Sequence, residues 1–223
     1  MNFSETPITF VILGITILAS FAAFNNKELK SNWLFNPYLV KEHNQWYRAF
    51  THAFIHSDYM HLGFNMYVFF GFGLTLEQVF TDPVLWTMTF PDIPFWGVLK
   101  GRIIYTILYV GGVLYAVVPA MRKHSSNPSY NSLGASGAVS AILLAYIVLF
   151  PLNTLHLMFI PFPIPAIVMG IGLFIYEAYM NKRGGTGIAH DAHISGAIFG
   201  VVFILAVNYK FIGHFISEIS SFF

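Results

Sequence analysis

The chain has 223 residues, of which 56% are hydrophobic and only 9% are charged, and its formal net charge is +1. A soluble domain usually carries about 25% charged residues, so this composition excludes an ordinary soluble protein and predicts a polytopic membrane protein. No basic run points to a nucleic-acid partner. The chain has no cysteine, which excludes disulfides, thiolate metal sites and a cysteine nucleophile.

The first apolar run, Ile8–Phe24, has two interpretations: a cleaved signal peptide or a retained helix. A signal peptide needs a basic start, whereas the residues before this run include Glu5 and no Lys or Arg. The run is also nearly long enough to span a bilayer. We therefore expect a retained first transmembrane helix.

Six apolar stretches approach the roughly 20 residues that a transmembrane helix needs. In chain order they are Ile8–Phe24, Met60–Phe80, Ile103–Ala120, Gly134–Phe150, Leu157–Met180 and Ala192–Tyr209. No internal repeat and no appended soluble region accompanies them. The sequence therefore predicts an all-α fold, a six-helix transmembrane bundle that forms a single domain over residues 1–223.

Two connections between these stretches are unusual. Residues 25–48 form a connection that is too long for a hairpin and rich in aromatic residues, which favour the headgroup layer of a membrane. Residues 81–102 contain three prolines and two tryptophans, and the prolines argue against a continuous helix. We expect residues 81–102 to form an interfacial insertion between spans two and three.

Polar side chains gather at the starts of three predicted spans, where they are functional candidates by default. Ser136 lies in Gly-Ala-Ser-Gly at the start of the fourth span, and His61 and Asn65 lie four residues apart near the start of the second. His193 opens the sixth. Spans two, four and six of a serial bundle begin on the same side of the membrane, so these side chains can converge.

The residue types in the three clusters suit acyl transfer. A serine hydroxyl becomes a nucleophile when a histidine takes its proton, and an oxyanion needs N–H donors. Ser136 at a helix start has unpaired backbone N–H groups nearby, and His61 and Asn65 share one helix face. Small residues would allow the fourth and sixth spans to approach closely; these are Gly134, Gly137, Gly196 and Gly200.

Other interpretations of the same residues remain open at this point. Gly-Ala-Ser-Gly alone is typical of a helix start or a packing motif, and isolated polar residues in spans often only join helices. A metal site is a further possibility, because His52, His56 and His61 cluster and His190 lies three residues from His193. However, no His-Glu-x-x-His string occurs, and only Asp58 and Asp191 offer nearby carboxylates. We expect no metal and no cofactor.

Two further acidic residues, Glu77 and Glu177, lie near the ends of predicted spans. We expect both side chains to face the membrane interface rather than to take part in chemistry.

With these motifs in view, the chain resembles the rhomboid family of intramembrane serine proteases over nearly its whole length. The segment QWYRAFTHAFIHSDYMHLGFNMYVFFGFGLTLEQVF is similar to the Trp-Arg loop of that family, to its His-x-x-x-Asn element and to the Glu, here Glu77, that closes its second span. Gly-Ala-Ser-Gly is similar to its nucleophile motif, and AHISGAIFG is similar to its catalytic histidine segment. All three motifs follow one another in the order that the family shows.

The resemblance implies a Ser–His dyad without a carboxylate, with Ser136 as the nucleophile and His193 as the base. It assigns the oxyanion site to His61, Asn65 and the backbone N–H of Ser136, and it places Arg48 in a lipid-facing loop. The fifth helix and residues 181–189 would form a substrate gate. An aromatic residue often stands four positions after the nucleophile, where it supports the histidine, but this chain has Ser140 there.

The resemblance also implies a function and a location. We expect an endopeptidase in the bilayer that cuts transmembrane segments of single-span or polytopic membrane proteins, in a bacterial inner (cell) membrane. The alternative is a rhomboid-like pseudoprotease that binds membrane helices without cleavage. The family orientation puts the N-terminus in the cytoplasm and the catalytic ends outside, whereas the positive-inside rule favours the reverse. Eight of the basic residues fall on the catalytic side: Lys27, Lys30, Lys41, Arg48, Arg122, Lys123, Lys182 and Arg183.

Overall fold

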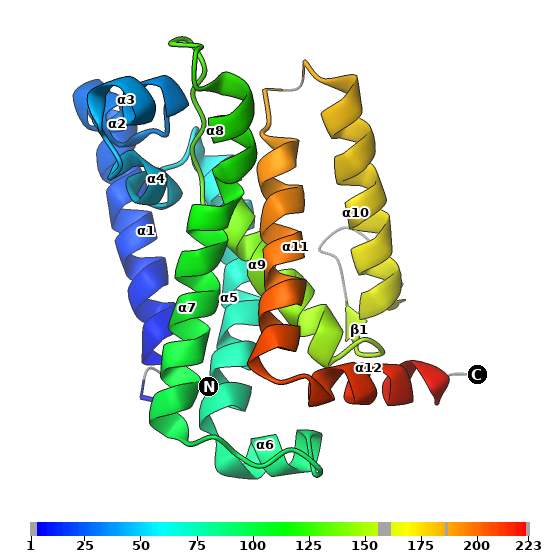
Figure 1. The fold of residues 1–223 in the computed structure, drawn as a ribbon. Helices are drawn as coiled ribbons and strands as arrows, with labels where there is room; N and C mark the ends of the chain where they lie inside the picture. Colours follow the sequence, from blue (N-terminus) through cyan, green and yellow to red (C-terminus); the bar gives the residue numbers. More distant parts are fainter. Residues whose placement is uncertain (1–3, 156–161, 186, 222–223) are drawn as a thin grey trace.

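The structure is a computed structural model that describes residues 4–155, 162–185 and 187–221, and it is a helical bundle (Figure 1). Each predicted span overlaps one long helix: α1 (Pro7–Asn25), α5 (Tyr59–Thr81), α7 (Val98–Ala116), α9 (Ser136–Leu149), α10 (Ala166–Arg183) and α11 (His190–Val207). The all-α prediction is confirmed. Residues 157–161 of the predicted fifth span and residue 186 of the predicted gate lie outside the described residues.

Three segments of the described chain are long and apolar enough to cross a membrane by themselves, Pro7–Asn25, Val98–His124 and His190–Val207. The segment Val98–His124 joins α7 to the short helix α8 (Val118–His124). Helix α9 is shorter, with 14 residues, and it is apolar on all sides. A helix with that composition belongs in the interior, and α9 lies at the centre of the bundle between α5, α7 and α11.

The connection between α1 and α5 folds into short helices at one end of the bundle. They are α2 (Lys27–Trp33), α3 (Pro37–His43), α4 (Arg48–Thr51) and the 3-10 helix η1 (His52–Phe54). Asn26 and Asn36 cap α2 and α3 by accepting N–H groups of the first turns. Phe35 is fully buried and forms a two-way backbone bridge with Ser132, at 2.9 and 3.0 Å. This bridge fixes the chain that leads into α9.

The connection over residues 81–102 lies at the opposite end of the bundle and does not continue α5 (Figure 1). Asp82 caps α6 (Pro83–Thr89), whose first position is a proline, as helix starts favour. Trp86 is fully buried among aromatic rings that include Trp96 and Phe211 of α12 (Lys210–Ser220). The break in the helix is confirmed, and the interfacial position of this insertion stays a prediction.

Glu77 does not face the membrane interface, and that expectation is wrong. Its side chain is fully buried in α5 and accepts hydrogen bonds from the backbone N–H groups of Ile8 and Thr9, at 2.9 and 2.7 Å. The Thr9 hydroxyl donates to the same carboxylate at 2.7 Å. The first N–H groups of a helix have no intrahelical partner and carry partial positive charge. A buried carboxylate there therefore joins the start of α1 to α5.

Candidate active site

The starts of α9 and α11 meet through a direct contact between Ser136 and His193. Ser136 is the first residue of α9, and His193 lies in the first turn of α11. The Ser136 Oγ and His193 Nε2 atoms are 2.6 Å apart. The two residues are 57 positions apart in the chain, and the structure thus brings together the two that the sequence singled out as nucleophile and base.

Glycines make this close approach possible. A Cβ atom on Gly196 would overlap the backbone carbonyl of Gly137, and one on Gly200 would overlap the carbonyl of Ala141. Helices α9 and α11 therefore touch backbone to backbone, as small residues permit in membranes. Gly134 has a φ of +116°, which L side chains rarely adopt, and a Cβ there would lie 2.7 Å from the Cε1 atom of the His61 ring.

The loop before Ser136 is held by the segment that precedes α5. The Gly134 N–H donates to the carbonyl of His52 at 2.9 Å, and the Ala135 N–H donates to Nε2 of His56 at 3.3 Å. The other ring nitrogen of His56 lies 3.0 Å from the Ser20 hydroxyl of α1. Burial, with a smaller effect from nearby His61, lowers the pKa of His56 to about 3. The ring is therefore neutral and accepts the Ala135 N–H.

Sequence reasoning missed this role of His56, which it considered only as a metal ligand. The available signal was its position five residues before His61 within HAFIHSDYMH. No sequence spacing marks a neutral histidine that orders a loop. The partner of His56, Ala135, also lies 79 positions away in the chain.

The predicted oxyanion donors lie beside the same loop. The His61 ring takes up the space that a Cβ on Gly134 would need, and its Nδ1 atom lies 3.0 Å from the Ser57 hydroxyl. Asn65 is 4% exposed, and its side-chain amide donates to the carbonyl of His61 at 2.9 Å. This bond within α5 fixes the orientation of the amide. The oxyanion role of both residues stays a prediction.

Arg48 is buried within the connection between α1 and α5, which it stabilises. Its guanidinium donates to the backbone carbonyls of Ser31 and Leu34, at 2.7 and 2.9 Å, and to Gln45 at 2.6 Å. The neighbouring Trp46 and Tyr47 are exposed.

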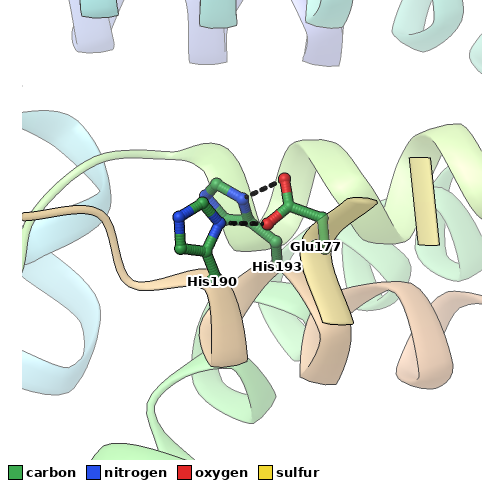
Figure 2. Close-up of side chains that lie close together, drawn as sticks. All are labelled: Glu177, His190 and His193. Atoms are coloured by element: carbon green, nitrogen blue, oxygen red, sulfur yellow. Dashed lines mark hydrogen bonds and ion pairs between the residues drawn. The ribbon is translucent and has the colours of Figure 1, made fainter. Parts of the chain in front are cut away.

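Glu177 of α10 contacts both histidines at the start of α11, as Figure 2 shows. Its Oε1 atom lies 3.0 Å from Nδ1 of His193, and its Oε2 atom lies 2.6 Å from Nδ1 of His190. The expectation that Glu177 faces the membrane interface is wrong. The ring of His193, which lacks an aromatic neighbour at Ser140, is instead held by this carboxylate.

The same three residues are the group within the described chain whose geometry would suit a metal ion. One ligand atom from each of Glu177, His190 and His193 lies within 4.8 Å of the others. Two histidines and a carboxylate are common zinc ligands. However, both carboxylate oxygens already face a ring nitrogen at hydrogen-bond distance, so bonds within the cluster account for the orientation of the carboxylate.

Comparison with known proteins places the chain in a family. A family model described as Rhomboid domain matches residues 43–210. The chain is 29% identical over 198 residues to RHOMBOID-like protein 12, mitochondrial, of Arabidopsis thaliana, covering 86% of this chain and 55% of the plant protein. It is 24% identical over 200 residues to Rhomboid protease GlpG of Haemophilus influenzae, covering 89% of each. The chain thus spans about half the length of the plant relative.

The family model covers most of this chain. The protein therefore belongs to the rhomboid family and is an integral membrane protein.

Proposed function

We propose that the protein is an intramembrane serine endopeptidase that cleaves transmembrane segments of other membrane proteins. One observation carries the proposal: the Ser136 hydroxyl lies 2.6 Å from Nε2 of His193 at the start of a buried helix. A nucleophile and a base within hydrogen-bond reach are the requirement for covalent acyl transfer. The relative from Haemophilus influenzae, whose name describes a rhomboid protease, supports the same activity.

The chemistry follows from the contacts of the two residues. His193 Nε2 takes the hydroxyl proton of Ser136 as Oγ attacks the carbonyl carbon of the substrate. The oxyanion forms beside the N-terminus of α9, where free N–H groups and the helix dipole favour negative charge. In this proposal His61 and Asn65 supply the additional side-chain donors. His193 then protonates the leaving amine, and water hydrolyses the acyl-enzyme by the reverse sequence of proton transfers.

The wider setting is part of the proposal. Residues 1–223 act as one rhomboid-like domain, with residues 81–102 at the membrane interface, in a bacterial cell membrane. The substrates are single-span or polytopic membrane proteins. The bacterial relative supports this compartment, while the plant relative is named as mitochondrial; fractionation of the source cells distinguishes the two. Because the chain has no cysteine, single cysteines introduced into exposed loops would report its orientation directly.

The test is proteolysis by purified protein in liposomes that contain a single-span substrate rich in small residues. The parent and Ser140→Ala should cleave this substrate and react with a fluorophosphonate probe, and Ser136→Ala should do neither. Ser140 is a matched control because it lies one turn further along α9. Equal labelling of parent and Ser136→Ala would overturn the assignment, and substrate capture without cleavage would identify a pseudoprotease.

A further inference from the structure

We propose that Glu177 is the third member of the hydrolytic machinery, a positioning residue that orients the ring of His193, and that His190 holds its carboxylate in place. This inference rests on the proposed function. It replaces the expected dyad with a Ser–His–Glu triad. In this triad a second histidine, His190, forms a hydrogen bond with the carboxylate oxygen that does not face His193.

The first support is a continuous line of hydrogen bonds from the nucleophile to the carboxylate. Ser136 Oγ lies 2.6 Å from Nε2 of His193, and Nδ1 of the same ring lies 3.0 Å from Oε1 of Glu177. A carboxylate can only accept hydrogen bonds, so Nδ1 carries the ring proton and donates it. The lone pair of Nε2 is then free to accept the proton of Ser136. This is the tautomer that a general base needs.

The second support is the way His190 fixes the carboxylate. Its Nδ1 atom donates to Oε2 of Glu177 at 2.6 Å, and the ring is 4% exposed. The rings of His190 and His193 meet edge to face with centroids 6.1 Å apart. Each oxygen of Glu177 therefore faces one histidine (Figure 2), and the carboxylate cannot rotate away from His193 without breaking the bond to His190.

The third support is where the three residues come from. Ser136 begins α9, His193 lies in α11, and Glu177 comes from α10. The residues of α10 that are buried lie near its start, at Ala166, Met169 and Gly170, whereas the half that carries Glu177 is largely exposed. The bonds of Glu177 to His190 and His193, beside the contact of the Tyr176 ring with His190, therefore hold this half of α10 in place. The hydrolytic set is complete only while this half of α10 lies against α11.

The charges balance through the reaction. When Ser136 Oγ bonds to the substrate carbonyl carbon, its proton moves to Nε2, and His193 becomes a cation beside the Glu177 anion. When the C–N bond breaks, the Nε2 proton moves to the leaving nitrogen and the ring is neutral again. The Nδ1 proton stays on His193 throughout, hydrogen-bonded to an ionised Glu177. The carboxylate thus stabilises the charge that appears in the transition state.

The decisive variant is Glu177→Gln, because an amide has the shape of the carboxylate but replaces one acceptor oxygen with an NH2 group that only donates. The amide oxygen can accept from only one of the two histidines, and its NH2 group must face the other. A His193 ring that receives the NH2 group carries its proton on Nε2 and cannot act as a base. We expect kcat to fall at least about 100-fold, because the corresponding acid-to-amide change in a serine protease triad costs about 10⁴-fold, while KM changes less than about threefold.

A double variant separates orientation from simple structural support. In Glu177→Gln with His190→Ala, the amide oxygen faces His193 alone and accepts its Nδ1 proton. We expect kcat to recover at least about tenfold over Glu177→Gln. Glu177→Asp should keep more activity than Glu177→Gln, and Glu42→Gln is the control because Glu42 is an exposed carboxylate on α3.

The outcomes distinguish this inference from the proposed function. If the parent shows no Ser136-dependent labelling or cleavage, the proposed function fails. If the parent cleaves through Ser136 but Glu177→Gln and Glu177→Ala keep the parental kcat per folded molecule, Glu177 only fastens α10 to α11 and the triad is overturned. If kcat falls in Glu177→Gln and the double variant is no better, the tautomer argument is also overturned.

Discussion

Gly196 of α11 lies directly on the backbone carbonyl of Gly137, one residue after Ser136, the proposed nucleophile, begins α9. No side chain larger than a hydrogen fits between the two helices at this level. Gly200 and Ala141 repeat the arrangement one turn further along. The distance between Ser136 and His193 is therefore fixed by contact between two backbones, which cannot adjust as side chains can.

Gly196→Ala should greatly reduce activity, because the new methyl group forces α11 away from α9. Overpacking of this kind costs about 1–3 kcal/mol, and a displacement of about 1 Å at a catalytic pair can cost about 100-fold in rate. Turnover measured beside a melting curve should show both effects. Gly14→Ala is the control, since a Cβ there meets nothing within 4 Å. Parental turnover in Gly196→Ala would contradict the close-contact account.

Asn65→Ala should lower turnover by at least about tenfold if Asn65 donates to the oxyanion. The donor acts as negative charge develops, so substrate binding should change little. The double variant with His61→Ala should be less than additive, because both donors would serve one oxygen. If the amide only stabilises α5 through its bond to the His61 carbonyl, the melting temperature would fall and the folded fraction would cleave at the parental rate.

Acid should destabilise the protein through two buried histidines. Burial lowers the pKa of His52 to about 4, and burial, aided by His61, lowers that of His56 to about 3, against an ordinary value of 6.5. Asp58 opposes the shift at His56. Because both folded-state pKa values lie below the unfolded value, the stability from each neutral ring is complete above pH 6.5. It is lost as pH falls toward 4 and 3, by about 1.4 kcal/mol per pH unit per ring.

Melting curves between pH 7 and pH 4 check this prediction. His56→Gln should melt lower than the parent at pH 7 and show a shallower fall toward pH 4, because one of the two titrating rings is gone. His43→Gln should behave as the parent, since His43 is exposed on α3. An unchanged slope in His56→Gln would show that the acid sensitivity comes from other groups.

EDTA and phenanthroline should leave the activity unchanged. The cluster of Glu177, His190 and His193 is joined by direct hydrogen bonds, and the proposed mechanism uses no Lewis acid. Rates are compared before and after chelation, and again after zinc is added back. Reversible loss of activity that zinc restores would instead assign these three residues, which could hold an ion, to a metal site.

The helices and the Ser136–His193 pair could be predicted because their signals are local or topological. Apolar length marks a span, and polar residues at the starts of alternate spans must share one side of the membrane. Glu77 and Glu177 could not be placed in this way. A single acidic residue near a span end looks the same in the sequence whether it reaches water or a neighbouring helix. The rotation of α5 and α10 about their own axes decides which of the two each carboxylate reaches. This rotation depends on contacts between segments that are distant in the sequence.

Helix α1 contributes no residue to the proposed triad of Ser136, His193 and Glu177, yet it positions the loop that leads to Ser136. Its start is fixed where Thr9 meets Glu77, and eleven residues later Ser20 contacts His56, which accepts the Ala135 N–H. Those residues span about 16 Å of helix. Adding one residue between these two anchors would turn Ser20 by about 100° and shift it by about 1.5 Å. The number of residues in the first helix thus sets the position of a loop more than one hundred positions further along the chain.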